Sequence, residues 1–176
     1  FLLPLYIVSS KTKSMRRSIF QNILWTLPAE TAHNIKMALL GVVGKLPTGK
    51  WWLKLCHAPR SEELEREVFG IHFRNPIGVA AGFDPNGDRL NELSATGFSF
   101  VEIGSVVPRP QPGTPRPRLH RMRSIDSLID NSGYPSLGLE YVLNNVRKRT
   151  KHTRNLVIGC NIGRLTASHR DDTVNE

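Results

Sequence analysis

The sequence predicts an α/β fold, in which parallel strands alternate with helices behind a small helical segment. From Met15 to about Val43, apolar residues recur with the period of an amphipathic helix. At Glu67 this period changes, and short apolar runs then alternate with helical patterns. Such alternation is typical of right-handed β/α units that build a parallel sheet.

In the first part, two helices are predicted, in residues 16–24 and 29–43. Pro28 suits the first turn of the second helix, and Glu30 complements its dipole. The second helix has one apolar stripe, formed by Ala32, Ile35, Leu39 and Val42.

Two short helices with apolar faces, basic ends and tryptophans fit a module that lies on a membrane surface. The same faces could instead pack on the main domain, and the pattern leaves both interpretations open. The earlier apolar stretch, residues 2–8, is interrupted by Pro4 and is too short to cross a bilayer.

The second part begins with a short hairpin or a bent strand around Gly70. A strand of small residues, 77–81, then ends in a loop and is followed by a helix at about residues 89–95. A second strand, 98–103, leads into a long segment rich in proline and arginine, residues 108–123.

A further helix, from residue 137 to about 148, and a third strand, 156–162, complete the pattern. Three such units cannot close an eight-fold barrel, which needs roughly 250 residues. The residues alone therefore predict either a small open α/β domain or the first part of a barrel. In both folds, ligands bind in the loops that follow the strands.

The formal net charge of +9 raises nucleic acids and anionic membranes as partners. Two basic groups, residues 109–123 and 147–154, are either solvated faces or sites for anionic ligands or lipid head groups. No zinc spacing or recognition-helix pattern supports nucleic acid. Cys56 and Cys160 are too few for a disulfide framework or a metal site, and Cys160 is expected to be a small buried residue.

The three strands end in short or amide-bearing residues. Ala81 and Gly82 end the first strand, Ser105 follows the second, and Asn161 ends the third. Short side chains allow a flat ligand to approach the backbone, and an amide can donate and accept at once. Tight packing at each junction is the alternative, but together the three ends suggest a heterocycle that forms hydrogen bonds along its edge.

The chain resembles the quinone-dependent (class 2) dihydroorotate dehydrogenases, which are flavin-binding TIM barrels. The segments that carry this resemblance are residues 75–84 and 97–106 for the first two barrel strands, 108–113 and 115–119 for the loop after them, 161–163 for the end of the third strand, and 27–33 for the helical extension typical of class 2. The resemblance implies a helical, membrane- and quinone-associated extension in residues 1–60. It also implies that residues 61–176 are the first three units of a (β/α)8 barrel.

The resemblance also implies the site residues. The positions that bind FMN in the family are Ala81, Gly82, Ser105 and Asn161. Asn131, Gly133 and Tyr134 lie in the segment that contacts the pyrimidine, and Arg121 matches an arginine beside the quinone site. The catalytic base of the family is a serine further along the chain, and no serine here lies in a matching motif. The 176 residues alone are therefore expected to be inactive.

The implied reaction is the oxidation of dihydroorotate to orotate in pyrimidine biosynthesis. A base removes the C5 proton, hydride passes from C6 to the flavin N5, and ubiquinone or menaquinone reoxidises the flavin. The implied location is the cytoplasmic face of the cell membrane or, in a eukaryote, the mitochondrial inner membrane, with the protein bound peripherally.

The sequence departs from the family pattern at three positions. At one of them Arg164 stands where the family has a lysine and keeps the charge. The other two weaken substrate recognition. Pro85 stands where the family carries a lysine, and proline offers neither charge nor donor. Asp130 stands where the substrate loop begins with an asparagine, and a carboxylate facing an anionic substrate is unfavourable. A shift of one residue would place Asn131 there instead. The alternative function is therefore a diverged, catalytically inactive relative that binds FMN or has a structural role.

Overall fold

The structure is a computed structural model that describes residues 23–24, 26–57, 62–125, 127–149, 153 and 155–165. The apolar stretch of residues 2–8 lies outside the described residues, as does almost all of the helix predicted in residues 16–24. The division of the chain at residue 60 into extension and barrel stays a prediction.

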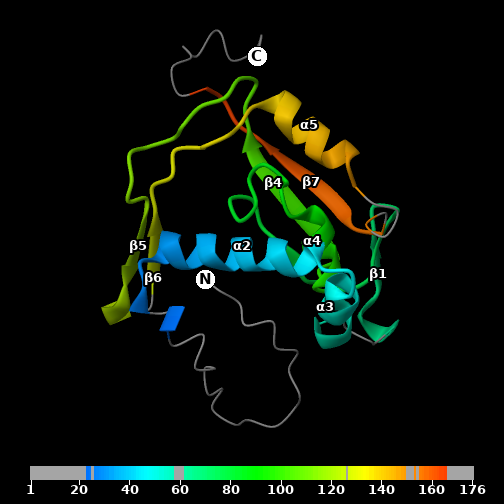
Figure 1. The fold of residues 1–176 in the computed structure, drawn as a ribbon. Coiled ribbons are helices and arrows are strands. Elements are labelled where there is room, and N and C mark those ends of the chain that lie inside the picture. Colours follow the sequence, from blue (N-terminus) through cyan, green and yellow to red (C-terminus); the bar gives the residue numbers. More distant parts are fainter. Residues whose placement is uncertain are drawn as a thin grey trace.

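A parallel sheet of three strands lies at the centre of the molecule (Figure 1). Its order is β3 (Gly78–Val79), β4 (Phe100–Val106) and β7 (Val157–Ile162), with β4 in the middle. Helix α4 (Leu90–Ala95) connects β3 to β4, and α5 (Leu139–Arg147) precedes β7. The predicted alternation of parallel strands and helices is thus confirmed.

The core lies where the central strand meets the two connecting helices. Val101 is completely buried and Ile103 almost so. Removing such apolar side chains from water is the main force that holds the units together. The buried cluster consists of Val79, Leu90, Leu93, Phe98, Val101, Ile103, Val106, Val142 and Leu156.

Two helices precede the sheet: α2 (Ala29–Lys45) and α3 (Gly49–His57). Helix α2 lies very close to α4, because its buried face has glycines where other residues would collide. A Cβ atom at Gly41 would lie 2.8 Å from the Arg89 guanidinium carbon. One at Gly44 would lie 2.4 Å from Cγ of Glu92. Side chains of α4 and its approach therefore press directly on the α2 backbone.

Only part of the predicted apolar stripe of α2 packs on the barrel units. Ala32 is buried, but Ile35, Leu39 and Val42 are 36%, 45% and 59% exposed. The reason is that α2 buries its small residues, among them Gly41, and so turns its larger apolar side chains outward. The packing interpretation is therefore wrong for these three residues.

Helix α3, which the sequence did not predict, extends this exposed apolar surface. Trp51 is 65% exposed and Trp52 is 53% exposed. Among the residues that the structure describes, no helix has the length and apolar character needed to cross a bilayer.

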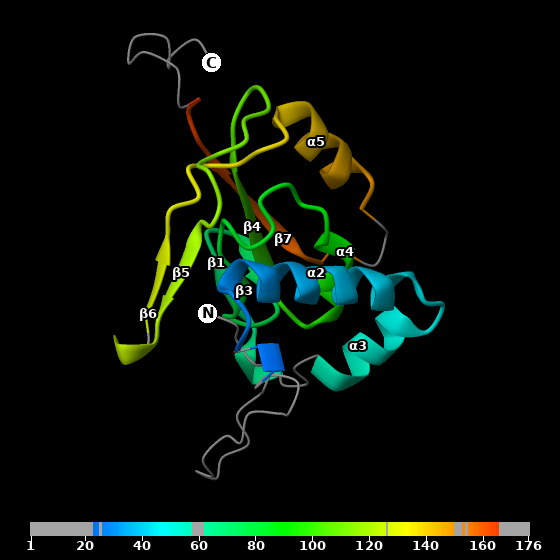
Figure 2. The ribbon, with the colours of Figure 1, turned by 60° about the vertical axis from the view of Figure 1, so that its left-hand side comes forward.

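Two antiparallel hairpins flank the sheet. The predicted hairpin around Gly70 is confirmed as β1 (Arg66–Val68) and β2 (Ile71–Phe73). The second, β5 (Leu119–Met122) and β6 (Ser127–Asp130), was not predicted and lies partly within the arginine-rich segment. Figure 2 shows this β5–β6 hairpin projecting away from the central sheet.

Candidate functional site

The carboxyl ends of the three parallel strands are joined side by side. The Gly82 amide donates to the Gly104 carbonyl at 2.9 Å, which links the end of β3 to β4. The Ser105 hydroxyl donates to Oδ1 of Asn161 at 2.5 Å, which links β4 to β7. The predicted positions on the three strands therefore form one continuous row, which we call the strand-end row: Ala81, Gly82, Ser105 and Asn161.

Gly82 leaves open space at one end of this row. Its φ of +92° is in the region that favours glycine, and a Cβ built on it meets no heavy atom within 4 Å. At Gly104 the opposite holds, because a Cβ there would lie 2.3 Å from the Asn161 carbonyl oxygen. Close packing holds the strands together, while a flat group can approach the backbone at Gly82.

A buried carboxylate fixes the loop that follows Gly82. Asp84 is only 2% exposed, and its two oxygens accept the amide hydrogens of Asp88 at 2.9 Å and Arg89 at 2.8 Å. Burial raises the pKa of Asp84 to about 6, although these hydrogen bonds favour the charged form. Asp84 thus orders the backbone between the strand-end row and α4.

Asn86 connects this loop to the segment before α5. Its Oδ1 accepts the Leu137 amide hydrogen at 2.9 Å. Its carbonyl accepts from Nδ2 of Asn145 at 3.0 Å. The loop after β3 is thus held against the segment that contains the predicted substrate residues.

Helix α2 reaches the same loop through His33. The rings of His33 and Phe83 meet edge to face, with centroids 4.9 Å apart. Burial lowers the pKa of His33 below its ordinary value, so the ring stays neutral at pH 7. The sequence argument did not select His33 as a site residue, although it ends the 27–33 segment that carries the class 2 resemblance.

The predicted substrate residues lie on a turn beside the proline-rich loop. The Asn131 amide donates to the Arg118 carbonyl at 3.0 Å. A Cβ at Gly133 would lie 2.7 Å from Cγ2 of Thr114, so the two segments are in close contact. Tyr134, which is 56% exposed, accepts from Nε2 of Gln111 at its carbonyl, at 2.8 Å.

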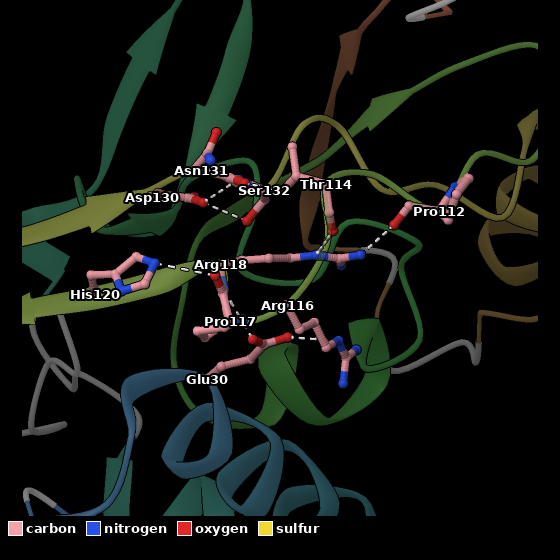
Figure 3. A network of polar contacts seen from close by, with 10 residues as sticks. All are labelled: Glu30, Pro112, Thr114, Arg116, Pro117, Arg118, His120, Asp130, Asn131 and Ser132. Atoms are coloured by element: carbon pink, nitrogen blue, oxygen red, sulfur yellow. Dashed lines mark hydrogen bonds and ion pairs between the residues drawn. The ribbon is translucent and has the colours of Figure 1, made fainter.

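An ionic network holds the proline-rich loop against α2 (Figure 3). Oε1 of Glu30 pairs with Nε of Arg116 at 3.0 Å, and Oε2 accepts the Arg118 amide hydrogen at 3.4 Å. The Arg118 side chain then folds back and donates to the carbonyls of Thr114 at 2.7 Å and Pro112 at 2.5 Å. Glu30 therefore has a partner distant in sequence, in addition to the predicted favourable position at the helix N-terminus.

The carboxylate of Asp130 is directed at its own turn. Its Oδ1 accepts the amide hydrogen of Ser132 at 2.9 Å and also the Ser132 hydroxyl. Aspartate commonly stabilises turns in this way. Figure 3 shows these contacts beside Asn131.

Arg121 lies where the β5–β6 hairpin meets the start of α2. One of its guanidinium nitrogens donates to the Leu27 carbonyl at 3.0 Å. Burial, and then the Arg121 charge, lower the pKa of Lys36 on α2. Arg121 is therefore part of the junction with the helical segment and lies apart from the strand-end row.

A cavity of about 460 Å³ lies between α2, the loop after β3, the proline-rich loop and the turn before α5. Gly82 and Pro85 contribute from the loop, and His33 and Met37 contribute from α2. Pro85 thus faces a space that a lysine at this position would supply with charge. Gly82, at one end of the strand-end row, and residues of α2 therefore line the same cavity.

One prediction near the row is wrong. Cys160 is exposed instead of buried. The reason is that β7 lies at the edge of the described sheet, so no further strand covers it. Among the described residues, no three histidine, cysteine or acidic side chains come together in an arrangement that could hold a metal ion.

Parallel β/α units whose ligand-sized site lies at the carboxyl ends of the strands define a class, the α/β proteins, which includes both open sheets and barrels. Comparisons with known proteins then narrow the class. The sequence model of the dihydroorotate dehydrogenase family matches residues 63–176. The chain belongs to the dihydroorotate dehydrogenase family.

Similar proteins carry the name dihydroorotate dehydrogenase (quinone). The one from Azotobacter vinelandii is 42% identical over 147 residues, which cover 84% of this chain and 40% of the relative. The one from Christiangramia forsetii is 36% identical over 92% of this chain and 46% of the relative. The chain thus spans less than half the length of these relatives.

Among solved structures, DHODH from Eimeria tenella in complex with ferulenol resembles the chain with a TM-score of 0.70 and 29% identity. The similarity covers 86% of this chain and 42% of the other. The ligand-free form of the same protein gives a TM-score of 0.68. The chain therefore has the fold of the N-terminal portion of this TIM barrel, as the sequence predicted.

Proposed function

We propose that this chain supplies the FMN-binding half of a quinone-dependent dihydroorotate dehydrogenase. The observation that carries the proposal is the strand-end row, with Ser105 bonded to Asn161 and open space at Gly82. Hydride acceptance from dihydroorotate is the chemistry that bound FMN supplies in such an enzyme. The protein's part is to position the two rings.

The residues present fit a flavin. An isoalloxazine edge needs hydrogen-bond donors and acceptors close to the backbone, and Asn161 and Ser105 offer an amide and a hydroxyl at adjacent strand ends. Gly82 admits a ring face because no side chain stands above it. Asp84 holds the loop that carries Gly82, so the space is kept open before the ligand arrives.

The substrate segment would orient the pyrimidine. Gly133 and Tyr134 lie on a turn that Asn86 and Gln111 hold in place. Asn131 is anchored through its backbone to Arg118, which leaves its side-chain amide on the exposed side of the turn. Preorganised polar groups of this kind lower the cost of aligning two reacting rings.

We also propose that the helical segment meets the membrane and admits the quinone. The exposed apolar residues of α2 and α3 support membrane-surface binding. The cavity, which His33, Met37 and Gly82 line, supports a path from α2 to Gly82. Arg121, the residue proposed for the quinone site, lies at the junction with the start of α2. The same proposal assigns the protein to the periphery of the cytoplasmic cell membrane or the mitochondrial inner membrane.

The test uses a completed barrel, in which this chain is joined to the remaining β/α units of the Azotobacter vinelandii relative. We expect it to purify with bound FMN and to reduce a quinone analogue when dihydroorotate is added. The matched control replaces Asn161 with leucine, which has a similar size but no amide. A colourless completed barrel that takes up no FMN would refute the proposal.

A second function, a diverged relative that binds FMN without turnover, is favoured by two residues. Pro85 brings no charge to the cavity, and Asp130 brings a carboxylate to the substrate segment. The bonds from Asp130 to Ser132 direct this carboxylate away from a substrate, which weakens the second argument. Flavin bound without turnover, with turnover recovered in Pro85→Lys, would establish that Pro85 is the cause.

A further inference from the structure

The tip of the β5–β6 hairpin carries apolar side chains that nothing in the described chain covers. Ile125 is 63% exposed and Met122 is 39% exposed. They lie at the end of β5 and in the short 3-10 turn of residues 123–125 that follows it. An apolar tip on a projecting hairpin is costly in water, so it indicates a contact surface.

The hairpin is fixed to the helical segment and does not hang free. Arg121, one residue before Met122, donates to the Leu27 carbonyl at 3.0 Å. Helix α2 also packs against β5. The position of the tip is therefore set relative to α2 and α3.

The tip and α3 lie on the same side of the molecule. In Figure 1 both reach below α2, with the hairpin at the left and α3 at the right. Figure 2 is turned about the vertical axis, and both still lie below α2. A flat surface placed beneath the molecule would thus meet the hairpin tip and α3 together.

The charge around these contacts is suited to an anionic surface. Residues 29–57 contain four lysines and one acidic residue, Glu30, which is paired with Arg116. In the sequence, Arg121 and Arg123 stand on either side of Met122, and one acidic residue, Asp126, follows Ile125. Basic residues beside exposed apolar side chains are typical of peripheral binding to anionic lipid.

We propose that the β5–β6 tip, through Met122 and Ile125, is a second membrane contact that enters the head-group region of an anionic bilayer beside α2 and α3. This inference rests on the membrane binding proposed above. Two contacts, one near each end of α2, would fix the tilt of this helix relative to the bilayer (Figure 1). The tip would then set the orientation of the cavity relative to the bilayer.

The test is flotation of the full 176-residue chain with vesicles of phosphatidylcholine and phosphatidylglycerol, and with vesicles of phosphatidylcholine alone. The tip variants are Ile125→Glu and Met122→Glu. The matched control is Ile129→Glu, because Ile129 is 49% exposed on the stem of the same hairpin, opposite His120. Trp51→Glu tests the helical contact separately, and circular dichroism checks that each variant is folded.

We expect Ile125→Glu to weaken binding to the anionic vesicles about tenfold, since it places a charge where an apolar side chain would enter the bilayer. Ile129→Glu should change it less than about twofold. Equal binding of Ile125→Glu and the unaltered chain, with a loss only in Trp51→Glu, would overturn the tip contact and leave the helical contact standing.

The other outcomes also decide. Failure of the unaltered chain to float would overturn both membrane proposals. It would not affect the FMN proposal, which is tested separately by FMN binding to the completed barrel. An equal loss in Ile129→Glu would show that the tip has no special role. If Ile125→Glu instead converts a dimer to a monomer without lipid, the tip is a protein contact and the membrane contact is refuted.

Discussion

Gly82 gives the sharpest test of the strand-end row, because a methyl group there would collide with no other atom of the described chain and would obstruct a ligand. A Cβ at Gly82 meets no heavy atom of the chain within 4 Å, although its φ is +92°. Gly70, at the turn of the β1–β2 hairpin, has a φ of +73° and the same open surroundings. Gly82→Ala and Gly70→Ala are therefore matched in having a positive φ and open surroundings, and they differ in their distance from the site.

Both variants should lose the same small amount of stability. Alanine in the left-handed region costs about 1–2 kcal/mol. The lower chain entropy of unfolded alanine offsets about 0.4–1 kcal/mol of this, which leaves a net loss of about 1 kcal/mol. Gly104→Ala should cost about 1–3 kcal/mol more, since its Cβ would lie 2.3 Å from the Asn161 carbonyl oxygen.

The assay measures urea unfolding and FMN affinity on the completed barrel. Gly82→Ala should weaken FMN binding by about tenfold or more, which corresponds to ~1.4 kcal/mol. Gly70→Ala should bind FMN as the unaltered protein does. If Gly82→Ala keeps full affinity at the expected stability, no ring lies on this backbone and the assignment of the row is refuted.

The remaining predictions concern groups that hold the site. The raised pKa of Asp84 means that the folded state binds this proton more tightly, so the contribution of Asp84 to stability should be largest below pH 3.8 and fall by roughly 3 kcal/mol as the pH rises to about 6. Asp84→Asn should remove that slope in urea unfolding, and an unchanged slope would contradict the argument. Arg118→Lys should cost about 1–2 kcal/mol, because lysine cannot reproduce the two bonds to Thr114 and Pro112; Arg147→Lys is the surface control, and an equal loss there would count against the network. In an NMR titration His33 should have a midpoint below 6.5, and a midpoint above that value would show that burial does not govern its pKa.

Much of the fold could be predicted because its signals are local. Strand β4 is a run of apolar residues buried between two neighbours, and α5 has a clear apolar side, so pattern alone gave both elements. The strand-end row could also be predicted, since parallel strands bring their carboxyl ends to one edge of a sheet.

The missing parts depend on pairing that no local pattern reveals. The β5–β6 hairpin was not predicted because β5 has four residues and follows a run of prolines, so only its pairing with β6 identifies it. The Glu30–Arg116 pair joins residues far apart in sequence. The exposure of Ile35 was unexpected because the fold buries glycine in preference to larger apolar residues at the α4 contact.

The glycines of α2 have a consequence for how a ligand reaches the cavity. Gly41 lies directly beneath the Arg89 guanidinium, and Nε of Arg89 donates to the Met37 carbonyl at 3.2 Å. Moving α2 away from α4 would break this hydrogen bond. It would also expose the α2 backbone at Gly41, against which the Arg89 side chain packs. A quinone that enters by this cavity, as proposed above, would therefore pass beside α2 without displacing it.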